Sequence, residues 1–409
     1  MVDIVIIGGG FGGVYAVNTL LKEFKNNPEV AITLISKTNY FLFIPMLHEV
    51  ATGGLCGHNL AEPFHEICKA KNVQFIKDTV EHISLEKKKI KTKTTELSYD
   101  YLILATGSST NFYNTPGAEQ YTGTLKSLED AHKIKADIVE AAEKMCAAKN
   151  EHERKKYATV AVIGAGATGI ELSIEIRELM DQLLKNNPNC TEKPNIILIQ
   201  AGSRILPQFP ELQKDAENAL LKHDIKILLN NPVSEITKDR IKTKSGATID
   251  AATIIWTAGT KPNTIPSTPA VCDARGYWCV NVYLQLPGHP EVFASGDCAQ
   301  CIPKGRDTPL PALAQTATEQ GKHAARNIIN SINGKPLKPF DYKLRGILIS
   351  LGRRKGIGLI KGIKIHGFIA WWLMRTVYLF KIIGTVNKLK TAYDWTLNLF
   401  AKRDTCQYE

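Results

Sequence analysis

Two groups of glycines have the spacing that binding of a dinucleotide requires. The first is Gly8-Gly9-Gly10-Phe11-Gly12-Gly13, and the second is Gly164-Ala165-Gly166-Ala167-Thr168-Gly169. Each follows a short β-branched run and precedes a helical pattern, which is the context that a Gly-x-Gly-x-x-Gly motif needs. There the backbone can approach a pyrophosphate, and the N–H groups of the helix N-terminus face the phosphates. One motif would be a weak signal, but two in this context predict two nucleotide-binding units.

The elements that must position these loops follow along the chain. Parallel strands are expected at residues 2–7 and 159–163 before the loops, and at residues 32–35 and 195–199 after the helices. Three later strands end in triplets that contain glycine. These triplets are Ala105-Thr106-Gly107, Thr257-Ala258-Gly259 and Ser295-Gly296-Asp297.

With these segments the chain resembles the two-dinucleotide-binding-domain flavoproteins. The resemblance implies an N-terminal unit that holds FAD, an inserted unit that holds NAD(P)H, and a contact between Asp297 and the ribityl chain of FAD. It predicts an α/β fold with two Rossmann-like domains. The FAD-binding domain is expected at residues 1–115 and 265–340 and the NAD(P)H-binding domain at residues 116–264.

The tip of the second strand in each unit decides which nucleotide fits. An acid about 20 residues after the motif usually binds a ribose hydroxyl, but the first unit has Ser36-Lys37 there and the second has Gln200. A serine can still bond the adenosine ribose of FAD. Because neutral Gln200 would not repel a 2′-phosphate, we expect NADH to be used and NADPH to be tolerated. The alternative is that Gln200 only bonds the ribose of NADH.

Four segments narrow the resemblance to the type II NADH dehydrogenases, the single-subunit NADH:quinone oxidoreductases, over essentially the whole chain. They are residues 39–47, Trp256-Thr257-Ala258-Gly259-Thr260-Lys261-Pro262-Asn263, residues 313–321, and the second motif with its Glu171. The resemblance implies that Glu171 lies near the nicotinamide and that Gln315 marks the quinone site. Thr318 and Glu319 differ from the commoner residues there, so the details of quinone contact stay open.

The expected site residues come from the same motifs. Glu171 and Gln315 are expected to be catalytic, and Gln315, Thr318 and Glu319 to bind quinone. The residues expected to bind FAD are Gly8, Gly10, Phe11, Gly12, Gly13, Ser36, Lys37, Ala105, Thr106, Gly107, Asp297 and Ala314. The residues expected to bind the nicotinamide nucleotide are Gly164, Gly166, Thr168, Gly169, Gln200, Ala258 and Gly259. No metal site is expected, because no set of cysteines and histidines has zinc spacing.

Simpler explanations exist for several of these residues. Glu171 is favourable near a helix start for dipole reasons alone, Gln315 could be a surface amide, and residues 40–47 could form a plain buried loop. Cys298-Ala299-Gln300-Cys301 could be a redox pair. Since it directly follows Gly-Asp, contact with the cofactor is the favoured interpretation.

The charge of the chain is concentrated at one end. Residues 335–409 hold 15 lysines and arginines against 4 acidic residues, which accounts for the whole net charge of +11. Gly367–Met374 is apolar and aromatic, and Leu389, Tyr393, Leu397 and Phe400 recur at helical spacing. Uncharged runs of this length are too short to span a bilayer, but they suit an amphipathic helix at its surface, with lysines and arginines near anionic lipid.

Residues 341–409 are therefore predicted to be membrane-docking helices. A packed pair of core helices and a homodimer interface are the alternatives, and nucleic acid is disfavoured because no nucleic-acid-binding fold accompanies the charge. Nine scattered cysteines and a strand pattern that begins at Asp3 indicate reduced thiols and no signal peptide. We expect a peripheral protein on the cytoplasmic face of a bacterial inner membrane.

The expected activity is transfer of a hydride from NADH to FAD, followed by transfer of two electrons to a membrane quinone such as ubiquinone, in a respiratory chain and without proton pumping. A sulfide:quinone oxidoreductase is one rival. It would need flanking cysteines, and the quinone-side stretch Ile349-Ser350-Leu351-Gly352 has none. A soluble NAD(P)H-dependent flavoprotein reductase and a protein that only senses NADH are the others.

Overall fold

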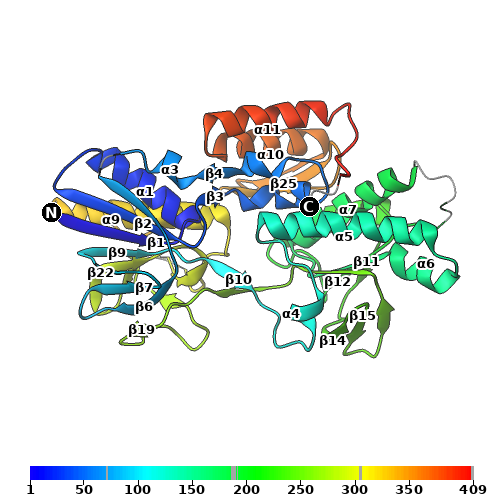
Figure 1. Ribbon diagram of the computed structural model, residues 1–409, viewed down its shortest axis with the longest axis horizontal. Helices are drawn as coiled ribbons and strands as arrows, with labels where there is room; N and C mark the ends of the chain where they lie inside the picture. Colours follow the sequence, from blue (N-terminus) through cyan, green and yellow to red (C-terminus); the bar gives the residue numbers. More distant parts are fainter. Residues whose placement is uncertain (71, 186–189, 191, 304–305, 407–409) are drawn as a thin grey trace. The chain divides into compact units, whose positions relative to one another are not determined.

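The computed structural model describes residues 1–70, 72–185, 190, 192–303 and 306–406 (Figure 1). These residues form two compact units, and each unit is assembled from three separated stretches of chain. Unit 1 consists of Met1–Leu42, Ala61–Ser109 and Thr260–Leu344. Unit 2 consists of Phe43–Leu60, Thr110–Gly259 and Arg345–Glu409.

Unit 1 is built on a six-stranded sheet. Its strands lie in the order β21 (Gln285–Leu286), β22 (His289–Ala294), β9 (Tyr101–Leu104), β1 (Val2–Ile7), β2 (Val30–Ser36) and β5 (Val73–Lys77). Neighbours are parallel except β21 and β22. Short β-branched strands suit this position because a parallel sheet is covered on both faces. Ile7 pairs with Ile35, so the ends of β1 and β2 lie at the same edge.

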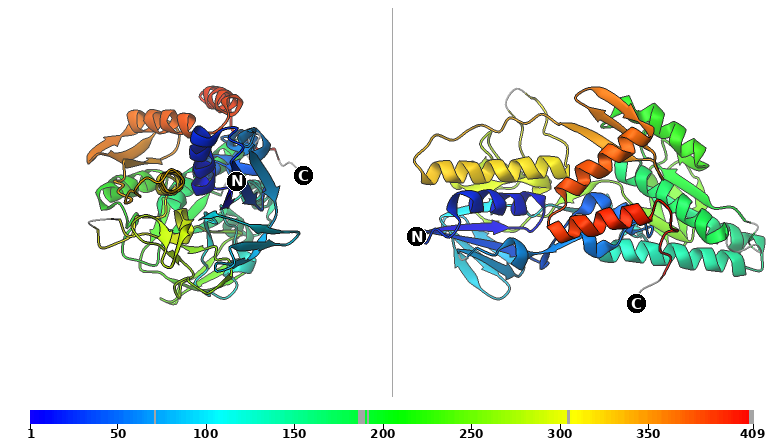
Figure 2. Two further views of the ribbon diagram at one scale, coloured as in Figure 1. Left: turned by 90° about the vertical axis from the view of Figure 1, so that its left-hand side faces the viewer. Right: turned by 90° about the horizontal axis from the view of Figure 1, so that it is seen from above.

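Two helices cover one face of this sheet. Helices α1 (Phe11–Phe24) and α9 (Ala314–Ile332) pack against each other and lie side by side in Figure 2. Glycine is required at their crossing, since a Cβ on Gly321 would overlap the carbonyl oxygen of Gly12. The other face packs on a core that contains Trp278, which is fully buried. The first glycine motif, which lies between β1 and α1, is thereby fixed against α9.

Unit 2 repeats the same plan around a smaller sheet. Its order is β13 (Ile225–Leu228), β12 (Asn195–Ile199), β11 (Thr159–Ile163) and β17 (Thr253–Trp256), all parallel. Helix α7 (Ala167–Lys185) follows β11 directly, and α5 (Leu128–Ala147) packs beside it. Helix α5 begins in a capping box, in which the Ser127 side chain accepts from the N–H of Asp130.

The C-terminal part of unit 2 is a hairpin sheet followed by two helices. The sheet order is β24 (Gly346–Ser350), β25 (Gly356–Ile360) and β26 (Ile363–His366), all antiparallel. Helices α10 (Gly367–Lys381) and α11 (Thr385–Leu397) come next, shown in orange and red in Figure 1. Gly384, at φ +87°, makes the turn between them. Throughout the described ranges, no helix is both long enough and apolar enough to cross a membrane.

The remaining elements are short. In unit 1 they are β3 (Tyr40–Leu42), β4 (Ala61–Pro63), α3 (Phe64–Ile67), β6 (Val80–Ser84), β7 (Lys89–Thr92), β8 (Glu96–Ser98), β18 (Thr260–Pro262), β19 (Ser267–Thr268), β20 (Trp278–Cys279) and β23 (Ala299–Gln300). In unit 2 they are α2 (Leu47–Val50), α4 (Ala118–Tyr121), α6 (Glu151–Ala158), α8 (Gln213–Lys222), β14 (Val233–Thr237), β15 (Arg240–Thr243) and β16 (Thr248–Asp250). Strand β10 (Ser108–Thr110) runs from one unit into the other. Four 3-10 turns complete the described part: Ile44–Met46, Gly57–Leu60, Pro210–Leu212 and Gly296–Cys298.

The predicted α/β fold with two Rossmann-like sheets is confirmed, since each glycine loop lies between a parallel strand and a helix. The predicted C-terminal helices exist as α10 and α11. Their membrane role and the predicted domain boundaries stay predictions.

Candidate active site

The first glycine loop has the geometry of a phosphate cradle. Gly8 has φ +112°, and a Cβ there would overlap the carbonyl oxygen of Ala105. A Cβ on Gly13 would likewise overlap the carbonyl oxygen of Gly8. No described atom lies within 4 Å of a Cβ built on Gly10. The loop is therefore held closely against β9 and α1 but stays open at Gly10, where a pyrophosphate would approach the backbone.

Ser36 lies beside this loop at the end of β2. The N–H of Gly8 donates to the carbonyl of Ile35 at 2.8 Å, which fixes the end of β2 next to the loop. A Cβ on Gly9 would come within 2.8 Å of the Ser36 hydroxyl. Ser36 is buried and the next residue, Lys37, is exposed. Both predicted residues thus lie at the strand tip, where an adenosine ribose is expected.

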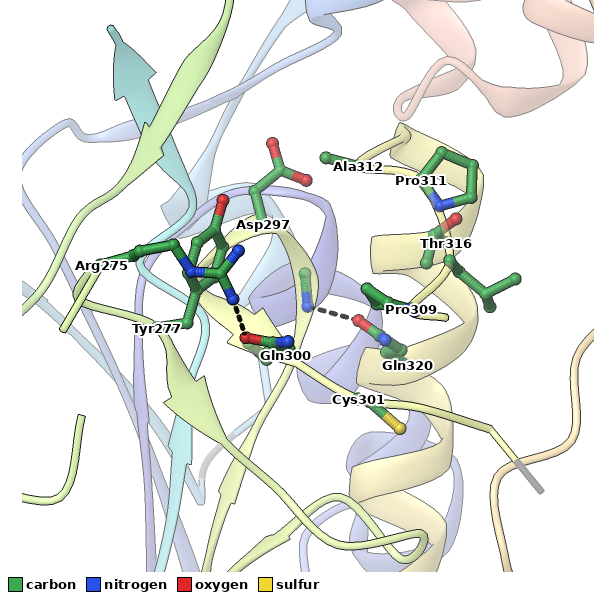
Figure 3. A pocket seen from close by; sticks show the side chains of 13 residues that line it. Arg275, Tyr277, Asp297, Gln300, Cys301, Pro309, Pro311, Ala312, Thr316 and Gln320 are labelled. Atoms are coloured by element: carbon green, nitrogen blue, oxygen red, sulfur yellow. Dashed lines mark hydrogen bonds between the residues drawn. The ribbon is translucent and has the colours of Figure 1, made fainter. Parts of the chain in front are cut away.

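Asp297 lies beyond β22 in a loop fixed at both ends. Gly296 has φ +77°, and its N–H donates to Oε1 of Gln320 at 2.7 Å. One Asp297 carboxylate oxygen accepts from the Ser108 hydroxyl at 2.8 Å. Figure 3 shows Asp297 beside the start of α9, at a cavity of about 150 Å³. The cavity lining includes Arg275, Tyr277, Gly296, Gln300, Cys301, Pro309, Pro311, Ala312, Thr316 and Gln320.

Two buried hydroxyls at this place have no hydrogen-bond partner among the described residues. The side-chain oxygens of Ser295 and Thr316 have no hydrogen-bond partner within the described parts of the chain. Thr316 lines the cavity, and a Cβ on Gly12 would come within 2.8 Å of the Ser295 oxygen. Buried hydroxyls without partners are rare and indicate a missing group. Together with the open Gly10 and with Asp297, they fit a flavin nucleotide laid along the edge of the unit 1 sheet.

The predicted quinone-site residues share one side of α9. Thr318 and Glu319 come three and four residues after Gln315, so the three side chains lie on the same side of the helix. All three are half-buried. The Tyr342 hydroxyl donates to Oε1 of Gln315 at 3.1 Å. Lys322 lies 3.0 Å from a Glu319 carboxylate oxygen. Ala314, predicted to contact FAD, is the first residue of the helix.

Phe11 and the Ala105-Thr106-Gly107 triplet complete the predicted residues of unit 1. The Phe11 ring meets the edge of Phe41 at 5.0 Å. The N–H of Ala105 donates to the carbonyl of Ile7 at 2.8 Å, and the Thr106 hydroxyl donates to the carbonyl of Asn263 at 2.6 Å. The triplet is therefore fixed at the same sheet edge as the first glycine loop.

The second glycine loop repeats the first in unit 2. Gly164 has φ +108°, and a Cβ on Gly169 would overlap the carbonyl oxygen of Gly164. No described atom lies within 4 Å of a Cβ built on Gly166, which is exposed, as is Thr168. The N–H of Gly164 donates to the carbonyl of Ile199 at 2.8 Å. This second open cradle has the form expected for the nicotinamide nucleotide, with Ala258 and Gly259 following β17.

Gln200 follows β12 and is tied to this loop. Its Oε1 accepts from the N–H of Ala165 at 3.1 Å, and its Nε2 donates to the carbonyl of Arg204 at 3.2 Å. The side chain therefore bridges the loop and the segment after the strand. The side chain at this strand tip is a neutral amide, not a carboxylate.

Glu171 is buried in the second turn of α7. One carboxylate oxygen accepts from the N–H of Ser350 at 2.9 Å, and the other lies 3.8 Å from Nδ1 of His48. Burial raises the pKa of Glu171, and the charges of Glu175 and Glu49 add to this, while His48 and the Ser350 N–H act against it. Glu171 is thus a buried carboxyl with a raised pKa, bonded to the predicted quinone-side stretch 349–352.

Glu171 belongs to a larger group that we call the buried acid cluster. It contains His48, Glu49, Glu171, Glu175, Glu178, Arg375 and Arg403. The guanidinium of Arg403 pairs with Glu175 and with Glu178, and it also donates to the Thr52 hydroxyl at 3.0 Å. Residues 48–49, 375 and 403, which are far apart in the sequence, therefore meet at one face of α7.

Arg375 and Glu49 form the second ion pair of the cluster. They lie 3.2 Å apart, and the other Glu49 oxygen accepts from the Trp395 indole N–H at 2.9 Å. The Arg375 guanidinium lies over the Trp371 and Trp395 rings at 4.4 and 4.7 Å. Helices α10 and α11 are thus joined to α2 by a buried charge between two aromatic faces.

Some predicted residues belong to different units, and the structure adds residues that were not predicted. Gln315 belongs to unit 1 and Glu171 to unit 2. Cys298 and Cys301 are buried free thiols, and burial raises the pKa of Cys301 to about 11, which favours the protonated form. Sequence reasoning missed Thr316 and Tyr342 in unit 1, and in unit 2 the other members of the buried acid cluster. Two sequence signals could have indicated these residues. Thr316 and Gln320 are polar residues four apart in α9, and Glu175 and Glu178 are acidic residues in an apolar helix.

Three comparisons place these features among known proteins. The model of the pyridine nucleotide-disulphide oxidoreductase family matches residues 2–321. A type II NADH:quinone oxidoreductase of Staphylococcus haemolyticus is 30% identical over 93% of this chain and 96% of its own. NDH2 from Plasmodium falciparum, solved in complex with NADH, gives a TM-score of 0.86 at 20% identity over 99% of both chains. The sulfide:quinone oxidoreductase of Aquifex aeolicus gives 0.75, also at 20% identity, over 98% of this chain and 95% of that one.

Proposed function

Because the chain belongs to the type II NADH:quinone oxidoreductases, within the pyridine nucleotide-disulphide oxidoreductases, we propose that it oxidises NADH through a bound FAD and reduces a quinone. The observation that carries this proposal is the pair of open glycine cradles at Gly10 and Gly166, each between a parallel strand and a helix. FAD, when bound, supplies the hydride acceptor and the electron donor to quinone. The chain supplies binding, orientation and proton control.

In unit 1 we propose that the backbone at Gly10 and the helix α1 N-terminus hold the pyrophosphate of FAD, with Ser36 at the ribose and Asp297 at the ribityl chain. Thr316 and Ser295 offer hydroxyls for the same cofactor, since both are buried without a described partner. The FAD-binding domain then comprises residues 1–115 and 265–340.

In unit 2 we propose that Gly166 and the start of α7 hold the pyrophosphate of NADH, with Gln200 near the adenosine ribose. The NAD(P)H-binding domain then comprises residues 116–264. Gln200 carries no charge to repel a 2′-phosphate, so NADPH is expected to be a slower substrate rather than a rejected one. An NADH preference in kcat/KM above about a thousandfold, roughly 4 kcal/mol, would contradict this.

Gln315 and Glu171 take different parts in the proposed reaction. Gln315 presents an amide to a quinone carbonyl, and the Tyr342 hydroxyl bonded to its Oε1 fixes how that amide is turned. Thr318 and Glu319 line the same approach. Glu171, bonded to Ser350, lies near the nicotinamide in this proposal and holds or releases a proton there.

Helices α10 and α11 are proposed to dock on the membrane, at the cytoplasmic face of a bacterial inner membrane. Leu389, Tyr393 and Phe400 are 67%, 63% and 85% exposed, and Trp372 and Phe380 on α10 are 55% and 75% exposed. Large apolar side chains this exposed mark an interaction surface. Lysines and arginines in residues 335–409 would attract anionic lipid, at about 1 kcal/mol for each one near the surface.

The test uses purified full-length protein. Yellow protein that oxidises NADH with a short-chain quinone, followed by nucleotide absorbance and the flavin spectrum, is the expected result. A colourless chain that takes up no FAD would refute the proposal. Quinone reduction driven by sulfide but not by NADH would assign the chain to the sulfide:quinone oxidoreductase activity instead. Replacing the exposed Trp372 and Phe380 by glutamate in the full chain should release the protein from membranes, and a folded variant that still sediments with them would contradict the docking.

A further inference from the structure

Tyr113 is an exposed aromatic residue that the proposed cycle does not yet use. It is 63% exposed, although its loop is firmly held. The N–H of Tyr113 donates to Oδ1 of Asn111 at 2.9 Å, and the Asn111 carbonyl accepts from the indole N–H of Trp256 at 3.0 Å. The ring of Phe112 packs against that of Trp256, with centroids 5.7 Å apart. The loop is therefore fixed to the end of β17, with Phe112 packed on the core and Tyr113 outside it.

The backbone at Tyr113 is strained. Tyr113 has φ +50° and Asn114 has φ +55°, so two successive residues other than glycine occupy the left-handed region. This conformation is uncommon for a bulky side chain. Strained residues gather at active sites and at ligand-binding loops, where the surrounding structure holds them in place. The strain therefore indicates that Tyr113 has a role beyond packing.

The ring of Tyr113 lies on the backbone of Gly259. A Cβ built on Gly259, which has φ +70°, would overlap the Tyr113 hydroxyl and would lie 2.6 Å from the ring carbon that carries it. Only glycine leaves room for the ring at this position. Because backbone covers only part of the side chain, the rest of the ring is open to a ligand.

Gly259 lies at the crevice of unit 2 where a dinucleotide is expected. Strand β11 has β12 on one side and β17 on the other. The chain leaves β11 toward β12 through α7, so the strand order reverses between β11 and β17. Ligands of open parallel sheets bind outside the carboxyl ends of the strands at such a reversal. The two strand ends are in contact there, since the Thr257 hydroxyl donates to the carbonyl of Gly164 at 2.9 Å.

The positions of two other residues indicate which half of the nucleotide reaches Tyr113. Gln200 follows β12, where the adenosine ribose is expected, and the open backbone at Gly166 is the place for the pyrophosphate. A dinucleotide bound in this way crosses the end of β11 from the β12 side to the β17 side. On this path the nicotinamide half arrives at residues 257–259, where Tyr113 lies.

We propose that the open part of the Tyr113 ring binds the nicotinamide ring and prefers its oxidised form. The inference rests on the proposed function and deepens it, because it names a residue for the nicotinamide half of the same site. Hydride transfer uses one face of the nicotinamide ring, so a side chain can lie on the other face. The ring of NAD⁺ is a cation, whereas the dihydronicotinamide of NADH is neutral, and the face of a tyrosine ring attracts a cation.

The same contact would assist the reaction as well as binding. When the C4–H bond of the dihydronicotinamide breaks, the hydride leaves with both electrons and positive charge develops on the ring that remains. A tyrosine face stabilises this charge more than it stabilises bound NADH. An interaction that is stronger in the transition state than in the ground state increases the rate of the chemical step.

The first measurement is equilibrium binding by calorimetry, and it needs no quinone. The full-length holoenzyme is titrated with three ligands: NAD⁺, a tetrahydro analogue of NADH that is neutral and transfers no hydride, and ADP-ribose, which lacks the nicotinamide. Tyr113→Asn removes the ring, and asparagine tolerates the left-handed backbone. Its Kd for NAD⁺ should rise about 3–30-fold. Its Kd for the neutral analogue should rise less, and its Kd for ADP-ribose should equal that of the wild type.

Three further variants separate the ring from the fold. Tyr113→Leu keeps an apolar side chain without a ring and should behave like Tyr113→Asn. Tyr113→Phe keeps the ring face and should bind NAD⁺ with nearly the wild-type Kd. The matched control is Tyr121→Leu, which replaces a partly exposed tyrosine on α4 of the same unit and should leave all three Kd values unchanged. Thermal melting of each variant checks that it is folded.

The second measurement follows flavin reduction by stopped flow. At saturating NADH, reduction should slow about 3–30-fold in Tyr113→Asn and remain close to the wild-type rate in Tyr113→Phe. Reoxidation by a short-chain quinone should not change in either variant.

The outcomes are distinct. A folded Tyr113→Asn or Tyr113→Leu variant whose Kd for NAD⁺ rises less than about threefold overturns the inference. Equal weakening of NAD⁺ and ADP-ribose also overturns it, because the tyrosine would then act only on the shape of the loop. Selective loss of NAD⁺ affinity supports it. Wild-type protein that binds none of the three ligands contradicts the proposed function itself, which is a separate result because it does not involve Tyr113.

Discussion

Replacing Arg403 by methionine should destabilise unit 2 severely. Arg403 pairs with Glu175 and Glu178, which are 5% and about one fifth exposed, and it also donates to Thr52. Removing one partner of a buried ion pair leaves an uncompensated charge and costs about 3–5 kcal/mol. For a unit of this size each kcal/mol lowers the melting temperature by about 2–4 °C, so a fall of about 6–20 °C is expected.

The pH dependence of this loss gives a sharper test. Burial acts to raise the pKa of Glu175, but Arg403 and the other nearby cations outweigh it, so the pKa is lowered. A carboxyl with a lowered pKa stabilises the fold above its unfolded pKa, and the contribution is lost as the pH falls through the folded value. Without Arg403, burial outweighs the remaining cations. The pKa of Glu175 in the folded protein should then lie above its pKa in the unfolded chain. The deficit of Arg403→Met should therefore be largest near neutral pH and shrink toward about pH 5.

Thermal and urea unfolding, followed by tryptophan fluorescence across this pH range, measure the effect. Trp371 and Trp395 contact Arg375 in the same cluster and so report on it. The matched control is Arg240→Met, which breaks a half-exposed pair with Asp250 and should change the stability little, because solvent screens exposed ion pairs. Adding Glu175→Gln and Glu178→Gln to Arg403→Met should restore most of the stability. A melting temperature equal to that of the control, or a deficit independent of pH, would refute the reasoning.

Three further perturbations test the cofactor loop, the quinone site and the docking surface. Gly13→Ala would force a Cβ onto the carbonyl oxygen of Gly8, so the purified protein should retain several-fold less FAD, read from the flavin-to-protein absorbance ratio. Full FAD content would contradict the cradle. Tyr342→Phe removes a hydrogen bond to Gln315 of about 0.5–1.5 kcal/mol, so KM for quinone should rise about 2–12-fold while the NADH half-reaction is unchanged. Equal changes in both half-reactions would indicate a purely structural role. Leu389→Glu places a charge on the exposed apolar face of α11, so flotation with anionic vesicles should recover several-fold less protein. Undiminished flotation would place the membrane contact elsewhere.

Local patterns in the sequence predict the two halves of the fold well. Each glycine motif is defined by its neighbours in the chain, and the strands before and after it are short apolar runs with β-branched residues. The position of each loop between a parallel strand and a helix, and the open backbone at Gly10 and Gly166, agree with these local features. Asp297 likewise lies at the end of its predicted strand, near the first loop.

The buried acid cluster could not be predicted in this way. His48, Glu171 and Arg403 are separated by more than a hundred residues at each step, so no local pattern joins them. Their charges are compatible with burial only because they meet, and that pairing is a property of the folded chain. Phe43–Leu60 also belongs to unit 2 although it follows a strand of unit 1, and nothing in its composition indicates this.

The position of Arg403 has a consequence for synthesis of the protein. Arg403 is made after every other member of the buried acid cluster, so α7 leaves the ribosome with Glu175 and Glu178 lacking their counter-charge. An apolar helix that carries two unneutralised carboxylates is a poor partner for packing. Unit 2 should therefore complete its core only after residue 403 has emerged, whereas the β1–β2 half of unit 1 can form while translation continues.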